Sequence, residues 1–216
     1  MKKHIVILLT SATLLLSSCL KLVKLYHGVH APKMETVENI TAFAQKKNIP
    51  VEGSAMIAED SILYSMFKRL NNHILFDSNG YAIKFNSGFE NEKCGGNILS
   101  FIEGLNTISY IERDSNWTLE KESKMWVDYG TKVPYDLQKK INGEAFNYFV
   151  VYYWNVFSGN PNHREAVKDL QASIAKNSRV KIKMILVNQD IRDNIDLKKF
   201  ARRANQINGI KVEIKE

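Results

Sequence analysis

The fold is decided by one stretch near the C-terminus, Tyr148-Phe149-Val150-Val151-Tyr152-Tyr153-Trp154-Asn155-Val156-Phe157. Its aromatic and β-branched residues predict a β-strand. Because the run is apolar at both odd and even positions, we expect a central strand that is covered on both faces. The next residues are Ser158-Gly159-Asn160-Pro161, in which Asn160 suits a helix N-cap and Pro161 suits a first helical turn. The stretch therefore predicts a strand that leads directly into a helix.

The residues that follow continue this alternation of strand and helix. The first helix carries an apolar stripe of helical period, formed by Ala166, Val167, Leu170 and Ile174. We then expect a strand at 180–188, a helix at 197–206 and a strand at 210–214. A β-α-β-α-β order requires right-handed crossovers and parallel strands in the centre of the sheet. The predicted fold class is α/β, with a central mixed sheet and flanking helices.

Residues 35–146 read as an N-terminal α+β extension of the same compact unit. The expected elements are helices at 35–47 and 61–70, strands at 73–76 and 81–85, an apolar helix directly after Cys94, and two or three strands within 107–132. Asn79-Gly80 is expected to supply the positive φ angles of a tight hairpin between the first two strands. We expect Trp117, Trp126 and Tyr129 to be partly buried.

Composition excludes several classes of protein. The chain has 216 residues, 44% of them hydrophobic and 25% charged, which is ordinary for a globular protein and excludes a disordered or collagen-like chain. Two cysteines do not make a disulfide scaffold. The formal net charge is +7, so the protein is basic.

The N-terminus predicts export. Lys2 and Lys3 precede an apolar segment that is too short and interrupted to span a bilayer, which is typical of a signal peptide. Leu16-Ser17-Ser18-Cys19 resembles the lipobox of bacterial lipoproteins, in which the cysteine receives the lipid. Cleavage before Cys19 would remove residues 1–18 with two lysines, and the net charge would fall from +7 to +5.

This resemblance implies a place for the mature protein. A lipidated Cys19 would hold it on the bacterial envelope, since several acyl chains anchor durably where one is marginal. Residue 20 is Leu rather than an acidic residue, which in enterobacterial lipoproteins favours the outer membrane. Residues 19–34 would then form a tether between the lipid and the folded domain.

The C-terminal part, residues 147–216, resembles a second family. The strand ending in Trp154, the turn and helix after it, and the strand ending in Val187-Asn188-Gln189-Asp190 are similar to the core of membrane-tethered thioredoxin-like oxidoreductases. The similarity covers about residues 148–206 and implies a thioredoxin-like sheet. The family's CxxC dithiol is missing: its first cysteine falls at Ser158, and its second at Pro161 or, with one inserted residue, at Asn162. A serine cannot exchange disulfides, because its alkoxide does not form at neutral pH.

Cys94 is the remaining thiol, in Lys93-Cys94-Gly95-Gly96-Asn97. A nearby lysine and a helix N-terminus favour the thiolate, whereas burial against the following apolar helix disfavours it. Packing in the core is the favoured interpretation, and a reactive thiol is the alternative. The pattern predicts neither a metal site nor a cofactor.

The basic residues cluster in the last part of the chain. One expected strand carries two alternating lysines, Lys181 and Lys183. The expected helix after it carries four basic residues, and the last strand is flanked by two more: Lys198, Lys199, Arg202 and Arg203, then Lys211 and Lys215. Such a face suits an acidic partner or lipid head groups, although lysines also protect sheet edges from aggregation. Nucleic-acid binding is not expected, because the basic segment has no aromatic stacking platform.

The sequence thus favours an envelope lipoprotein whose domain lacks the thioredoxin redox centre. We expect a binding or interaction module, held on the membrane by its lipid and directed at another envelope protein. The alternatives are a thiol-dependent redox enzyme that uses Cys94 and a purely structural scaffold.

Overall fold

The structure is a computed structural model, which describes residues 34–59, 61, 73–84, 96–105, 107, 111–156 and 160–193. Of residues 96–97 and 160–164 it describes the backbone alone.

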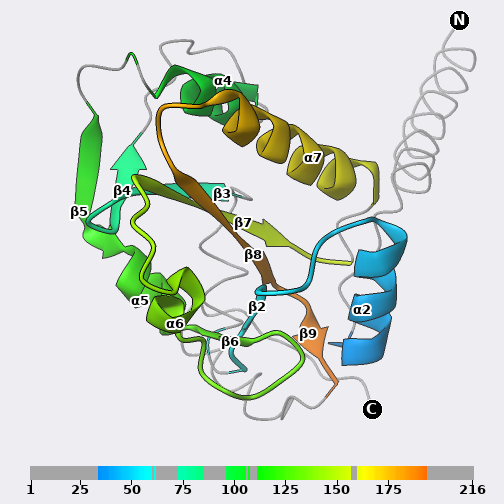
Figure 1. Ribbon diagram of the computed structural model, residues 1–216. Helices are drawn as coiled ribbons and strands as arrows, with labels where there is room; N and C mark the ends of the chain where they lie inside the picture. Colours follow the sequence, from blue (N-terminus) through cyan, green and yellow to red (C-terminus); the bar gives the residue numbers. More distant parts are fainter. Residues whose placement is uncertain are drawn as a thin grey trace, which may run out of the picture.

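Within these residues the chain forms a mixed sheet and a small strand pair. The sheet strands are β2 (Ala55–Ile57), β3 (His73–Asp77), β4 (Tyr81–Lys84), β5 (Glu112–Thr118), β6 (Trp126–Asp128), β7 (Tyr148–Trp154) and β8 (Ile182–Asn188). They lie in the order β5-β4-β3-β7-β8-β2-β6 (Figure 1). β7, β8 and β2 are parallel, and the other neighbouring strands pair antiparallel. β1 (Met34–Glu35) pairs in parallel with β9 (Ile191–Arg192).

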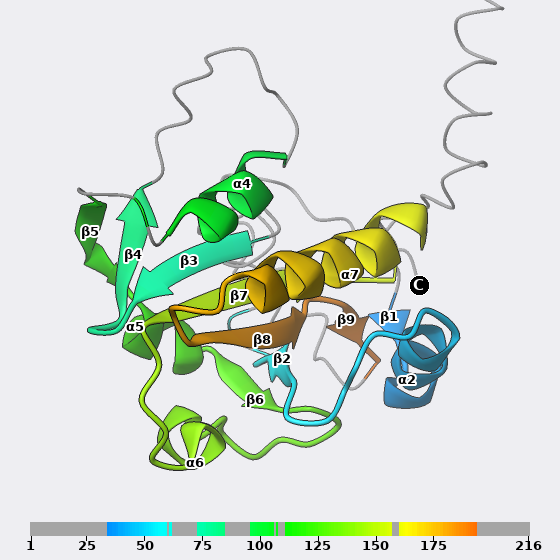
Figure 2. The ribbon, with the colours of Figure 1, turned by 45° about the horizontal axis from the view of Figure 1, so that its top comes forward.

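Helices cover both faces of this sheet. On one face lie α2 (Val37–Lys46), α4 (Gly96–Gly104) and α7 (Asn160–Lys176), and on the other lie α5 (Leu119–Ser123) and α6 (Leu137–Ile141) (Figure 2). The first three helices share one hydrophobic cluster with the sheet, and the shorter pair shares a second cluster.

β7 lies in the middle of the sheet, as its sequence predicts. Val150, Tyr152 and Trp154 belong to the cluster under the long helices, whereas Phe149, Val151 and Tyr153 belong to the other cluster. All of them are buried. Alternate side chains of a strand point to opposite faces, so a strand that is apolar at every position is stable only between two covered faces.

The β7-α7-β8 unit confirms the predicted α/β class. α7 begins at Asn160 with Pro161 as its second residue, and it leads into β8, which pairs in parallel with β7 along its whole length. Apart from Ser61, the helix expected at 61–70 lies outside the described residues, as do the helix expected at 197–206 and the strand expected at 210–214.

The two parts of the chain share one sheet. β2, from the N-terminal part, pairs with β8, and β3, from the same part, pairs with β7. The parallel pair β7·β8 is therefore flanked on both sides by strands that precede it in the sequence.

Three local features differ from the expectations. In the β3–β4 hairpin Gly80 has a positive φ of +78°, but Asn79 does not. The turn is instead held by the Asp77 carboxylate, which accepts hydrogen bonds from the Asn79 and Tyr81 amides at 2.9 and 3.0 Å. The short helix α5 separates β5 from β6, where only strands were expected. Trp126 is fully rather than partly buried, at 1% exposure.

Candidate functional site

The candidate site is the edge of the sheet where the parallel strands β2, β7 and β8 end. In open α/β sheets ligands bind at the carboxyl ends of the strands, where the loops and helix N-termini gather. β7 ends at Trp154 and α7 begins at Asn160, so only five residues separate the end of the strand from the start of the helix. We call this edge, from Trp154 to the first turn of α7 together with Asn188 to Arg192, the C-terminal edge.

A buried carboxylate joins the ends of β7 and β8 at this edge. Asp190 is 3% exposed, and both of its carboxylate oxygens accept from the Val156 amide at 2.9 Å. Asn188 Nδ2 donates to Asp190 Oδ2 at 2.8 Å, and the Asp190 amide donates back to Asn188 Oδ1 at 3.0 Å. The Gln189 amide donates to the Trp154 carbonyl at 2.8 Å. These bonds hold the start of the β7–α7 connection against the tip of β8.

A second buried charge, Arg192, continues this edge on β9. It is 4% exposed, and its guanidinium donates to the carbonyls of Thr131 and Ile57 at 3.3 Å each. Burial lowers the pKa of Arg192, while the charge of Glu59 acts in the opposite direction. Glu35, the register partner of Arg192 in β1, is 3% exposed. The segment that enters the domain from the N-terminus is therefore built into the C-terminal edge.

Two of the positions singled out by the expected thioredoxin-like resemblance, Pro161 and Asn162, lie at the same edge. Pro161 and Asn162 lie in the first turn of α7, whose side chains here are not described. Ser158 lies outside the described residues, as do Cys19 and Cys94. The helix expected after Cys94 is confirmed, since α4 begins at Gly96. The chain contains no other cysteine, so the sequence has no CxxC motif.

The C-terminal edge is held together by polar side chains that bond within the domain. Its described polar side chains are carboxylates, amides and a guanidinium, and they bond to main-chain groups and to one another. Such bonds fix the shape of an edge and leave no activated nucleophile within the part that is described.

A further buried charge lies on the face of the sheet that α5 and α6 cover. Glu122 of α5 is 2% exposed and accepts from the Tyr153 hydroxyl and from the Trp117 indole N–H, each at 2.6 Å. Two neutral donors thus solvate this carboxylate in place of water. The sequence does not reveal that Glu122, Glu35 and Arg192 are buried, because no local pattern distinguishes a buried charge from an exposed one. Asp190 was noticed, as part of the strand tip that resembles thioredoxin-like proteins.

Two further observations concern metals and membranes. Among the described residues there is no group of three or more His, Cys, Asp or Glu side chains placed to hold a metal ion. No helix in the described part of the chain has both the length and the apolar character that crossing a membrane requires.

Comparisons with known proteins found no match to a family model, to a curated sequence or to a solved structure.

Proposed function

We propose that this protein is an envelope-anchored lipoprotein whose redox-inactive, thioredoxin-like domain acts as a binding module. The observation that carries the proposal is the C-terminal edge. Positions that would bear a dithiol are occupied by Ser158 and by Pro161 or Asn162, and the latter two lie in the first turn of α7. The edge keeps its strand-to-helix geometry without the reactive groups.

The rigidity of this edge supports a binding role. Asp190 holds the Val156 amide, and the Gln189 amide holds the Trp154 carbonyl, so both strand ends are fixed before any partner arrives. A preorganised surface loses less conformational entropy on binding than a mobile one. The Cys19 lipobox supports the location, since it would place the domain on a membrane where an envelope protein could meet it.

Site-specific photocrosslinking in intact cells tests the binding role. A photoreactive amino acid at Asn162, in the first turn of α7, should give a discrete crosslinked product, and the same residue at Lys176, in the last turn, should not. Asp190→Ala, which releases the Val156 amide, should weaken the product from position 162. Equal products from the two positions, or none from either, would contradict recognition at this edge.

A reductase assay tests the absence of redox chemistry. Because Ser158 and Pro161 or Asn162 replace the dithiol, the purified protein should not reduce insulin disulfides with dithiothreitol as the electron source. Sustained turnover that Cys94→Ser abolishes would instead support the thiol-dependent alternative.

That alternative has one structural observation in its favour. α4 begins at Gly96, two residues after Cys94, and a helix N-terminus favours a thiolate. We expect desolvation by the apolar residues of α4 to act against the thiolate and to be the larger effect, because burial can shift a pKa by several units. We therefore expect native Cys94 to react slowly with an aromatic disulfide reagent at neutral pH and rapidly after unfolding. Reaction of the native thiol faster than free cysteine would make the redox role the better explanation.

A further inference from the structure

A basic surface runs from the end of the sheet opposite the C-terminal edge to helix α6, and it is defined here by Lys139, Lys140, Arg179, Lys181 and Lys183. Lys181 directly precedes β8 and Lys183 lies at its start. They alternate with Ile185 and Val187, which belong to the cluster under α5 and α6, so both lysines lie on that face of the sheet. Lys139 and Lys140 lie on α6, which packs against the same cluster.

The β8 part of this surface is held in place by the main chain. The Lys181 amide donates to Asn147 Oδ1 at 2.8 Å, and the Asn147 and Tyr148 amides donate to the Lys181 carbonyl at 2.8 and 3.2 Å. Lys183 Nζ lies 5.5 Å from the centre of the Phe146 ring. Phe146 in turn packs on Phe149, with 5.8 Å between ring centres. The two lysines therefore start from fixed positions beside a half-exposed aromatic ring.

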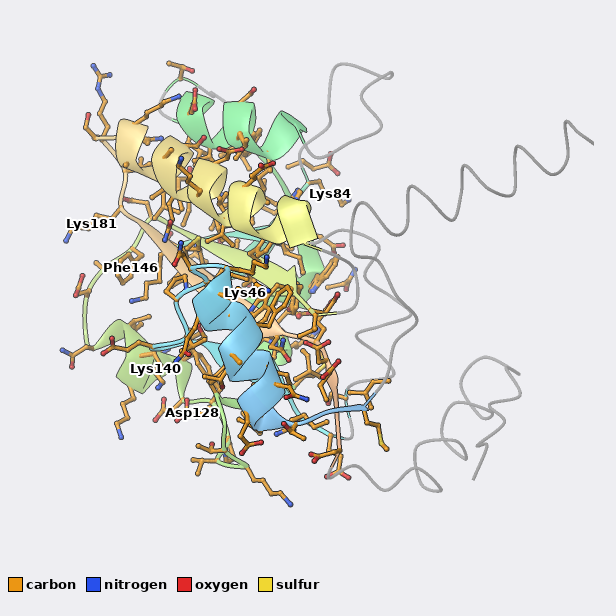
Figure 3. All side chains as sticks on the ribbon, turned by 90° about the vertical axis from the view of Figure 1, so that its right-hand side faces the viewer. Lys46, Lys84, Asp128, Lys140, Phe146 and Lys181 are labelled. Atoms are coloured by element: carbon orange, nitrogen blue, oxygen red, sulfur yellow. The ribbon has the colours of Figure 1, made fainter. Side chains whose placement is uncertain are left out.

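The α6 part of the surface also places a lysine beside an aromatic ring. Lys140 Nζ lies 5.6 Å from the centre of the Tyr135 ring and 3.1 Å from the Asp128 carboxylate. Figure 3 shows Lys181, Phe146 and Lys140 along one side of the molecule. Ile141 of α6 and Phe146 both pack against the cluster beneath them, which joins the two parts.

The basic residues of this surface outnumber the carboxylates described around them. Among the described residues, the carboxylates in contact with α6 or close to it in sequence are Asp128, which pairs with Lys140, Asp136, which caps α6 through the Lys139 amide, and the exposed Glu144. Among the described residues, the structure gives no ion pair to Lys139, Arg179, Lys181 or Lys183. Three free lysines and an arginine therefore remain beside Phe146 to meet an anionic surface.

We propose that this basic surface rests on the anionic lipid head groups of the membrane that holds the anchor, so that the C-terminal edge faces away from the lipid. The inference rests on the proposed lipid anchor. Each lysine or arginine near an anionic membrane contributes about 1 kcal/mol, which is weak for a free protein. For an anchored domain the contact is intramolecular and its effective concentration is high, so a few such residues suffice to orient it.

The length of the tether permits this orientation. The chain enters the domain at β1, beside β9 and the C-terminal edge, whereas the basic surface lies at the start of β8. A strand of 7 residues such as β8 spans only about 23 Å. Residues 20–33 reach about 45 to 50 Å when extended, which is enough to pass the domain and meet the bilayer at the basic surface.

Trace acetylation of lysines on the full-length acylated protein in vesicles tests the orientation. In vesicles containing anionic phosphatidylglycerol, Lys139, Lys181 and Lys183 should be modified roughly fivefold more slowly than in purely zwitterionic vesicles, and high salt should abolish the difference. Lys46 and Lys168, exposed on α2 and α7, should be modified equally in both. Equal rates for the basic surface in both lipids, or equal protection of every lysine, would overturn the proposal.

Two charge-matched variants sharpen the test. In the triple variant Lys139→Gln, Lys181→Gln, Lys183→Gln, the protection of the remaining Lys140 should be lost. In the control Lys46→Gln, Lys121→Gln, Lys168→Gln, which removes the same charge elsewhere, it should persist. Unchanged thermal unfolding of both variants excludes misfolding as the cause. Loss of protection in both variants would show that net charge alone is responsible and would contradict a specific surface.

The mass of the N-terminal peptide separates the two proposals. A chain without lipid on Cys19 contradicts the anchor, whereas an acylated chain with unprotected lysines contradicts the orientation alone. Protection that requires an added envelope protein rather than anionic lipid would assign the basic surface to an acidic protein partner and would also overturn the orientation.

Discussion

His73 makes the stability of the domain sensitive to mild acid. It lies at the start of β3 opposite Tyr152, and burial lowers its pKa from the ordinary 6.5 because the charged imidazolium is disfavoured there. The unfolded chain then binds more protons than the folded one as pH falls below about 6.5, so acid favours unfolding. We expect the free energy of unfolding, measured by urea titration, to fall between about pH 7.5 and about pH 5.5.

A His73→Gln variant provides the control for this effect. Its unfolding free energy should change less over the same pH interval, because glutamine does not titrate. Glu38, Glu103 and Glu120 also have lowered pKa values, but their effect is confined to more acidic solution, since their ordinary value is 4.5. An unaltered pH dependence in His73→Gln would assign the acid sensitivity to another group.

Two substitutions of Glu122 separate the effect of losing its charge from the effect of losing a hydrogen-bond acceptor. In Glu122→Gln the amide oxygen can still accept from Trp117 while its NH₂ group donates to the Tyr153 hydroxyl, so we expect stability within about 1 kcal/mol of wild type. Glu122→Ala removes the acceptor of both donors and should cost about 1–3 kcal/mol, mostly through the buried Tyr153.

A double-mutant cycle shows how much of this loss of stability comes from the Tyr153–Glu122 hydrogen bond. Tyr153→Phe together with Glu122→Ala should be less destabilising than the sum of the single variants in thermal or urea unfolding. Strict additivity would mean that the 2.6 Å contact contributes nothing to stability.

At the scale of elements, the contact between β7 and β8 depends on Asp190. Removing its carboxylate leaves the Val156 amide without the acceptor that it has at 2.9 Å, which should cost about 1–3 kcal/mol of unfolding free energy. Asp193→Ala, on an exposed residue of the same segment, should stay within about 0.5 kcal/mol. Amide hydrogen exchange of Val156 should accelerate in Asp190→Ala and not in Asp193→Ala. Unchanged exchange in both would show that the strand ends are held by other contacts.

At the scale of the whole molecule, the anchor depends on Cys19. In cells, Cys19→Ala should incorporate no lipid label and should leave the detergent phase in a phase-separation assay, because the acyl chains supply the membrane affinity. Cys94→Ala, the same change at the second cysteine, should be labelled and partitioned like wild type. A labelled, membrane-bound Cys19→Ala protein would contradict lipidation at this position.

Local pattern was sufficient for some elements and misleading for others. The apolar run of β7 and the stripe of α7 predicted both elements, since each pattern has the period of the structure that it forms. α5 was missed, because five residues are too few for a helical period and its start depends on Thr118, whose hydroxyl accepts from the Lys121 amide at 3.3 Å. The hairpin at Asn79-Gly80 was placed correctly, but its geometry depends on the Asp77 carboxylate.

The sequence by itself determined the α/β class, the position of the two-faced strand β7 and the β7-α7-β8 unit, because these depend on contacts and periods within short stretches of chain. Only the tertiary structure decided that strands from the N-terminal part flank this unit, and which charges are buried. Tyr153 and Glu122 are separated by 31 residues, Val156 and Asp190 by 34, and Arg192 and Ile57 by 135. A buried charge is stabilised by the partner that the fold brings to it, and that partner is not visible in the residues on either side.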